Sequence, residues 1–173
     1  MKKTILLFFL TVFIVSACDK TGDTSTKSVD GTYTGSFSKI GSDGYSVEIP
    51  GNATSVVTKT GNELITVHCY GNVLDTTIML NYYENHDSIM VCFTGSSFTS
   101  MYGHMLGQGH MSGGMMGDRN NNETEWEHHM KDEHNSGDIH FGGFDMMNQT
   151  FSYNFRMMEG ANPFYLRFTG VKH

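Results

Sequence analysis

The sequence predicts an all-β domain in which about eight strands form an antiparallel meander, arranged as a barrel or a sandwich. Polar and apolar residues alternate over most of the stretches concerned. A period of two is the pattern of a strand with one buried face and one wet face. Turn-forming residues separate several stretches, and the roughly 155 residues that would remain after N-terminal processing suit a single domain.

The strand pattern begins at Asp30 and is interrupted only once, by a long insertion. Two hairpins are predicted where residues 60–62 and 84–87 supply Gly, Asn and Asp between alternating runs. After the insertion, Phe151, Tyr153 and Phe155 alternate with polar residues. The expected strands are 31–37, 45–49, 54–59, 63–70, 76–83, 88–94, 151–157 and 164–169.

The first residues have the pattern of an export signal. Lys2 and Lys3 precede an apolar run over 5–15, which is shorter than the roughly 20 residues of a membrane span. The run ends in Val15-Ser16-Ala17-Cys18, which resembles the lipobox of bacterial lipoproteins. The resemblance implies cleavage before Cys18, a lipid on its sulfur, and a folded part outside the inner membrane. The alternative is an ordinary secretory signal with a spare cysteine.

This interpretation divides the chain into three parts. A lipoprotein signal peptide (1–17) is followed by a polar, flexible tether (18–29) and one β domain (30–173) with a metal-binding insertion over 101–149. We expect the cell envelope as location, on the outer membrane, its periplasmic side or the surface.

The charge of the mature chain limits its partners. Two of the eleven basic residues leave with the signal, so nine face eighteen acidic residues, a net charge of −9. This excess of negative charge argues against nucleic acid and anionic lipid surfaces as partners. The expected contact with the membrane is the lipid on Cys18. Eight acids lie between 118 and 145, where they would concentrate cations or serve only as a solvated face.

The opening strand, Gly31-Thr-Tyr33-Thr-Gly35, in a lipoprotein with a following meander is similar to the lipocalin-like (calycin-type) barrels of bacterial lipoproteins. The resemblance implies an up-and-down barrel. One group of that family is tied to copper stress and envelope sensing. This chain lacks the Cys-x-x-Cys that the group carries near its start, so no functional residue is carried over.

The insertion has a composition that a hydrophobic core would not have. Residues 101–147 hold eight of the thirteen methionines and six of the nine histidines, but only two aliphatic residues, Leu106 and Ile139. Methionine in a core is surrounded by Leu, Ile and Val, which supply most of the buried area. Thioethers and imidazoles without such neighbours favour soft metals, above all Cu(I).

A near repeat of Gly-His-Met is the first candidate ligand group. It comprises His104, Met105, His110 and Met111, followed directly by Met115 and Met116. A thioether has no proton to lose, so it can still bind a metal at acidic pH, where a histidine becomes protonated and no longer binds. The alternative is a Gly/Met loop with incidental histidines.

A short acidic stretch is predicted to form a helix, with Asn122 and Glu125 as a capping pair. At 100° per residue, one helical face would present a carboxylate and imidazole set that suits Zn(II) or Cu(II). We expect Trp126 and Met130 to pack on the barrel. The alternative is a charged surface helix. The candidate ligands are Glu125, His128, His129, Asp132 and, just beyond, His134.

Three further residues complete the candidate set. His140 precedes Phe141 and Phe144, which we expect to anchor the insertion to the barrel. Cys69 and Cys92 are either a disulfide or free thiol ligands. In a sequential meander, one strand would lie between them and place them about 9.6 Å apart, too far for a disulfide.

We therefore predict a lipid-anchored metal-binding protein that buffers, sequesters or transfers copper, with Cu(I) favoured and zinc possible. The sequence has no nucleophile or phosphate-binding motif, and we expect binding without catalysis. A metal-transfer partner is not identified by the sequence. The alternatives are a carrier of a small apolar ligand or haem, and a structural or adhesion lipoprotein.

Overall fold

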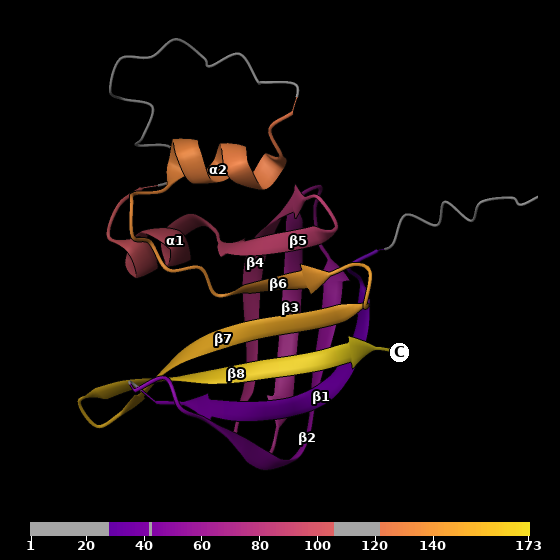
Figure 1. Cartoon of the computed structure of the whole chain (residues 1–173), viewed down its shortest axis with the longest axis vertical. Coiled ribbons are helices and arrows are strands. Elements are labelled where there is room, and N and C mark those ends of the chain that lie inside the picture. Colours follow the sequence, from indigo (N-terminus) through magenta and orange to yellow (C-terminus); the bar gives the residue numbers. More distant parts are fainter. Residues whose placement is uncertain (1–27, 42, 106–121) are drawn as a thin grey trace, which may run out of the picture.

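The computed structural model describes residues 28–41, 43–105 and 122–173 of the chain. Eight antiparallel strands follow one another around a closed barrel in sequence order (Figure 1). The predicted all-β meander is confirmed, and it forms a barrel rather than a sandwich. The strands are β1 (Gly31–Ile40), β2 (Ser46–Lys59), β3 (Leu64–Gly71), β4 (Asp75–Asn85), β5 (Ser88–Phe93), β6 (Gly142–Asp145), β7 (Thr150–Glu159) and β8 (Asn162–Lys172).

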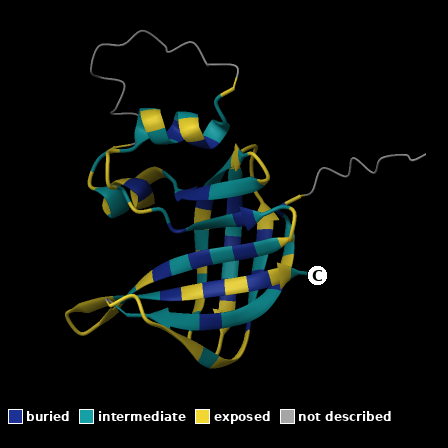
Figure 2. Ribbon diagram, in the orientation of Figure 1, coloured by how far each residue is buried: buried dark blue, intermediate teal, exposed yellow. Residues whose placement is uncertain are grey.

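Alternating side chains fill the barrel with aromatic rings. Buried and more exposed residues succeed one another along β3, β7 and β8 (Figure 2). Tyr33, Phe144 and Phe151 are at most 2% exposed, and the rings of Phe144 and Phe151 stack with centroids 4.4 Å apart. An eight-stranded barrel has an interior just wide enough for side chains to fill it. This interior is therefore the core of the domain.

Two predicted strands, 45–49 and 54–59, form the single strand β2. Between them, Pro50, Gly51 and Asn52 lie opposite a register shift of β1 that falls between Gly35 and Phe37. Gly51 adopts a φ of 114°, which only glycine reaches readily. The Pro-Gly pair thus lies in a β-bulge within one strand, where the sequence predicted two separate strands.

The strand β6 was not predicted, although its role as an anchor was. It contains two glycines and so shows no alternation. A Cβ atom on Gly142 would lie 2.2 Å from the carbonyl oxygen of Ser152, so glycine permits the close approach to β7. Phe141 and Phe144 are 5% and 1% exposed in the core, which confirms that they anchor the insertion.

Two helices, α1 (Gly95–Tyr102) and α2 (Glu125–Glu133), lie between β5 and β6 at one end of the barrel (Figure 1). The sequence predicted only α2. Its N-terminal cap is Thr124 paired with Glu127 and not Asn122 with Glu125, because the helix begins later than expected. In the described part of the chain, neither helix is long and apolar enough to cross a membrane.

The helices cover a second, smaller core on the outer face of the barrel. Cys92, Phe98 and Trp126 are its buried members, and Met130 packs against them. The expected packing of Trp126 and Met130 on the barrel is confirmed. Cys92 belongs to this outer core because its neighbour Val91 faces the barrel interior, and successive side chains point to opposite faces of a strand.

Candidate metal centre

Helix α2 and the loop after it bring histidines against the outer face of β5. Cys92 of β5 lies opposite Asn81 of β4. One step along that outer face, the ring of Tyr83 stacks on His129 of α2, with centroids 3.9 Å apart. His134 directly follows α2 as its C-cap residue, and His140 comes just before β6. Strand β5 and the segment between α2 and β6, which are about 40 residues apart in the sequence, therefore meet at Cys92.

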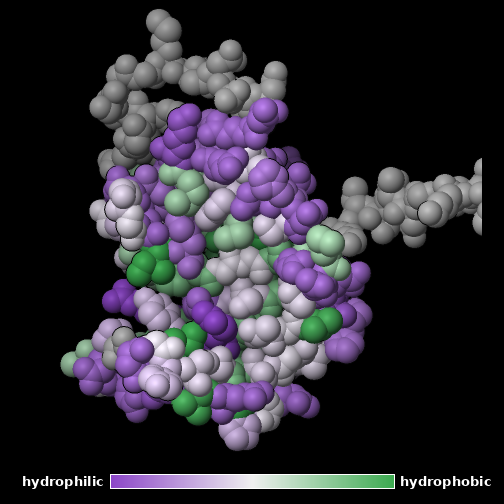
Figure 3. Space-filling view, viewed as in Figure 1, coloured by the Kyte–Doolittle hydropathy of each residue, from purple (hydrophilic) through white to green (hydrophobic). Residues whose placement is uncertain are grey.

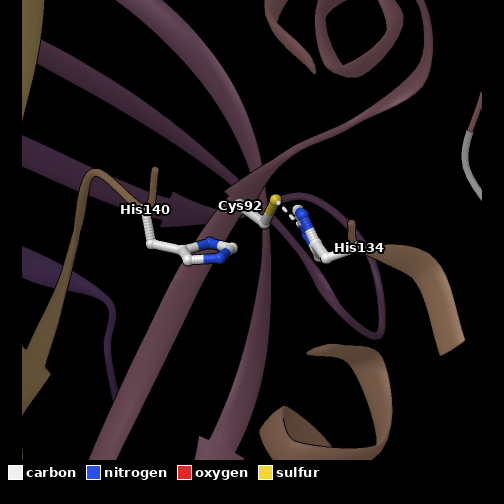
Figure 4. A group of neighbouring side chains, drawn as sticks. All are labelled: Cys92, His134 and His140. Atoms are coloured by element: carbon white, nitrogen blue, oxygen red, sulfur yellow. Dashed lines mark hydrogen bonds between the residues drawn. The ribbon is translucent and has the colours of Figure 1, made fainter. Parts of the chain in front are cut away.

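The thiol of Cys92 and two imidazoles converge there. Cys92 Sγ lies 3.4 Å from His134 Nε2. One ligand atom each from Cys92, His134 and His140 lie within 4.8 Å of one another, and both rings are directed toward the sulfur (Figure 4). Within 28–41, 43–105 and 122–173, these three form the one group with metal-ligand spacing. We call it the Cys92 centre.

Carboxylates orient two of the histidines. His134 Nδ1 lies 3.0 Å from Asp138 Oδ2, and His129 Nδ1 lies 2.6 Å from Glu133 Oε2. An Nδ1–H that donates to a carboxylate leaves Nε2 with a lone pair for a metal, as in metal sites with a carboxylate–histidine pair. The two Nε2 atoms lie 3.0 Å apart. Two lone pairs that face each other at this distance repel, and a cation bound between them would relieve this repulsion.

Aromatic side chains surround the two histidines of the centre. The side chain of His134 is 0% exposed, and the rings of Phe98 and Tyr102 meet it edge-on at 5.0 and 4.8 Å. The Trp126 ring meets His140 at 4.8 Å and 83°. Figure 3 shows a largely hydrophilic surface over α2. The donor atoms thus lie beneath a hydrophilic surface but among aromatic side chains. Electrostatic interactions are stronger in such a low-dielectric environment than in water.

Both ring nitrogens of His140 are buried, and neither has a hydrogen-bond partner among the described residues. A buried polar group left unsatisfied costs about 1–3 kcal/mol. Such groups are rare in folded proteins unless a ligand, an ion or a function accounts for them. His140 is therefore the residue whose placement points most directly to a bound group.

Burial also sets the protonation state of the Cys92 centre. It raises the pKa of the Cys92 thiol to about 12 and lowers the pKa of His134. It lowers the pKa of His140 to about 4, with the charges of neighbouring histidines acting in the same direction. At neutral pH the centre holds a thiol and neutral imidazoles. Metals bind thiolate and neutral imidazole, so a bound ion must displace only the thiol proton.

Asp138 ties His104 to the same centre. Its Oδ2 lies 3.0 Å from His104 Nε2 and accepts the backbone N–H of Asn135. Burial would raise the pKa of Asp138, but hydrogen bonds with His104, Asn135 and His134 outweigh it and lower this pKa. The hydrogen bond to Asp138 in turn raises the pKa of His104. His104 is thus linked to the candidate ligand His134 through Asp138.

The other candidate ligands that the structure describes lie outside the Cys92 centre. Met105 is 59% exposed, and Glu125 accepts the backbone N–H of Glu84. His128 and Asp132 pair with each other at 3.0 Å on the more exposed side of α2. Glu125, His128 and His129 line one cavity, but His129 is the most buried of them, and the metal set proposed for this helical face stays a prediction. His110, Met111, Met115, Met116 and Cys18 lie outside the described residues.

Cys69 and Cys92 are both free and do not form a disulfide. Cys69 lies opposite Thr76, and Cys92 lies opposite Asn81, so β4 runs between the two cysteines. The strand order is sequential, as the distance argument assumed. Cys69 belongs to the barrel core and Cys92 to the outer core. Of the two, only Cys92 is placed as a ligand.

The orienting acids, Glu133 and Asp138, were missed in the sequence. Each follows its histidine by four residues, which is one helical turn. The repeated spacing His129–Glu133 and His134–Asp138 would have been a usable signal. The same spacing joins His128 to Asp132, so it marks histidines that a carboxylate can orient, as in many metal sites, without singling out His129 and His134.

A cavity of about 180 Å³ adjoins His129 on its solvent side. Glu63, Glu125, His128 and Glu133 are among its lining residues. His129 thus separates an acidic opening from the buried nitrogen of His134. A cation approaching the Cys92 centre from this side would pass carboxylates first.

The known proteins offer no match from which a role could be transferred. A scan against protein-family models, a search of curated proteins and a search of solved structures each found none.

Proposed function

We propose that the protein is a lipid-anchored, extracytoplasmic copper-binding protein that buffers, sequesters or hands on copper. The observation that carries this proposal is the Cys92 centre, where a thiol and two imidazoles converge within 4.8 Å. His129 adjoins it at 3.0 Å from His134. Zinc is the second metal that this donor set accommodates.

The spacing of the donors fits a bound ion. A metal lies about 2.0–2.1 Å from an imidazole nitrogen and about 2.3 Å from a thiolate sulfur, which at a tetrahedral angle places the two donors about 3.5 Å apart. The distance from Cys92 Sγ to His134 Nε2 is 3.4 Å. The unpartnered nitrogens of His140 would gain a partner, and the sulfur favours a soft ion such as Cu(I).

A second reading of the same residues is weaker. Cys92, His134 and Asp138 follow one another in the order of a nucleophile, a base and its orienting acid. A thiol nucleophile must be reached by its substrate, but Cys92 is 2% exposed and burial raises its pKa, which removes the reactive thiolate. We therefore propose binding without turnover.

Titration with Cu(I) against a competing chelator tests the proposal. The wild-type protein is expected to hold Cu(I) with a sub-micromolar Kd, and Cys92→Ser is expected to weaken its tightest site at least tenfold. Cys69→Ser is the matched control, because Cys69 lies inside the barrel. Uptake no better than micromolar in the wild-type protein would end the copper assignment.

The His/Met repeat at 104–116 stays part of the proposal as additional copper ligands, on its sequence alone. Repeating the titration with Met111→Leu, Met115→Leu and Met116→Leu combined tests that part. A reduced number of bound ions would support these ligands. An unchanged number of bound ions would leave the Cys92 centre as the proposed site and would remove the methionines from the proposal.

The lipid anchor is proposed from the sequence Val15-Ser16-Ala17-Cys18. Changing Cys18 to Ser removes the only sulfur that could carry the lipid there, so the protein should leave the membrane fraction. Fractionation of expressing cells, with labelled palmitate as tracer, measures this. Labelling that persists in Cys18→Ser would contradict the assignment.

A further inference from the structure

The barrel wall is incomplete along parts of two strands. β5 pairs with β4 only from Leu80 to Asn85, and β6 pairs with β7 only from Thr150 to Tyr153. The remaining parts, 75–79 of β4 and 155–159 of β7, have a paired strand on one side only within the described residues. Since β5 and β6 are short, the two edges border a gap in the wall (Figure 1).

An apolar cavity of about 310 Å³ lies at this gap. Its lining includes Leu74 and Ile78 from the β4 side and Phe155 and Met157 from β7. Asn154 and Arg156 also line it, although they alternate with Phe155 and so belong to the outer face of β7. A cavity lined from both faces of one strand must open past the edge of that strand. We call it the side cavity.

The side cavity has one cationic side chain, at its rim. Arg156 is exposed and forms no ion pair with any residue of the described part of the chain. It also lines a neighbouring cavity of about 280 Å³, which shares Met101 and Phe141 with the first. A guanidinium is a planar fork that matches a carboxylate. A ligand with an anionic head group would therefore match the charge of Arg156 at the rim.

A buried hydroxyl is the second polar feature of the lining. Tyr153 is 2% exposed and lines the side cavity, and its hydroxyl has no hydrogen-bond partner among the described residues. An apolar pocket with a few convergent polar groups is the usual form of a small-molecule site, and about 300 Å³ is the lower end of the range for such sites. A ligand that fits this cavity would thus be small and mostly apolar.

We propose that the side cavity binds an amphipathic carboxylate, such as a medium-chain fatty acid. The chain lies between the open edges of β4 and β7, and Arg156 holds the carboxylate at the rim. This site is separate from the copper proposal, because none of Cys92, His134 and His140 lines the side cavity.

Titration calorimetry of the full-length mature protein with decanoate tests the site. We expect saturable one-to-one binding with a Kd on the order of 10–100 μM. Arg156→Gln should weaken decanoate about tenfold and leave decan-1-ol unchanged, because the alcohol has no charge. Ile78→Phe should block both ligands by filling the cavity, whereas Ile78→Val, which leaves it open, should bind as wild type.

The outcomes are separable from those of the copper experiment. Cys92→Ser should bind decanoate as the wild-type protein does. Absence of saturable binding would overturn the proposal. So would decanoate affinities that are equal in wild type, Arg156→Gln and Ile78→Phe, because the ligand would then bind elsewhere.

Discussion

Saturating Cu(I) is expected to raise the thermal unfolding midpoint of the protein by about 10 °C. An ion that binds only the folded state at about 1,000 times its Kd adds about 4 kcal/mol to stability. A domain of 150–250 residues gains about 2–4 °C per kcal/mol. The effect should be this large because the ligands come from both β5 and the segment between β5 and β6, so the ion links two parts of the fold.

The variant Cys92→Ser should lose most of that shift, measured as the difference between copper-loaded and metal-free protein by scanning calorimetry. Cys69→Ser serves as control, since any change in its baseline stability cancels in the difference. An equal shift in both variants would show that the ion binds away from the Cys92 centre. Repeating the scan with zinc ranks the two metals by the same measure.

Metal-free protein should lose stability as the pH falls from about 6.5 toward 4. The pKa of His140 is lowered from 6.5 to about 4 by burial and by neighbouring histidines. Between these two values the unfolded chain binds a proton that the folded protein does not, so acid favours unfolding. The stabilisation is therefore complete above pH 6.5 and is lost through this window, on the order of 3 kcal/mol.

Urea unfolding in the presence of a chelator, at several pH values, measures this dependence. His140→Phe should flatten it, and at pH 7 should be at least as stable as wild type because an unsatisfied buried polar group is removed. His68→Phe is the control, because His68 is exposed beside Asp75 on the outer wall. A wild-type slope retained in His140→Phe would contradict the assignment.

Most of the barrel could be predicted from the sequence because alternation reports directly on which side of a strand is buried. The predictions were wrong where that signal is interrupted. Pro50 and Gly51 fall between two predicted strands but form a bulge within the single strand β2. In β6, Gly142 and Gly143 carry no side chain that could alternate, and their value lies in how closely they let neighbouring strands approach.

The candidate site was predicted only in part. His134 and His140 were in the expected set, as was Cys92 as one of two open alternatives, and the structure brings these three together. Nothing in the local sequence shows that α2 packs against the outer face of β4 and β5, because that contact depends on which barrel face the helix covers. The same packing stacks His129 on Tyr83, while the more exposed His128 pairs with Asp132.

The closed ring of strands has a consequence for how quickly an ion could be exchanged. The ladder from β1 to β8 is completed without α1 and α2, and the helices add only a small satellite core. Lifting that cover would disturb few of the contacts that keep the strands together, so it costs far less than global unfolding. For a protein that binds an ion at the Cys92 centre as proposed, release would then require only a local opening step, with the barrel left intact.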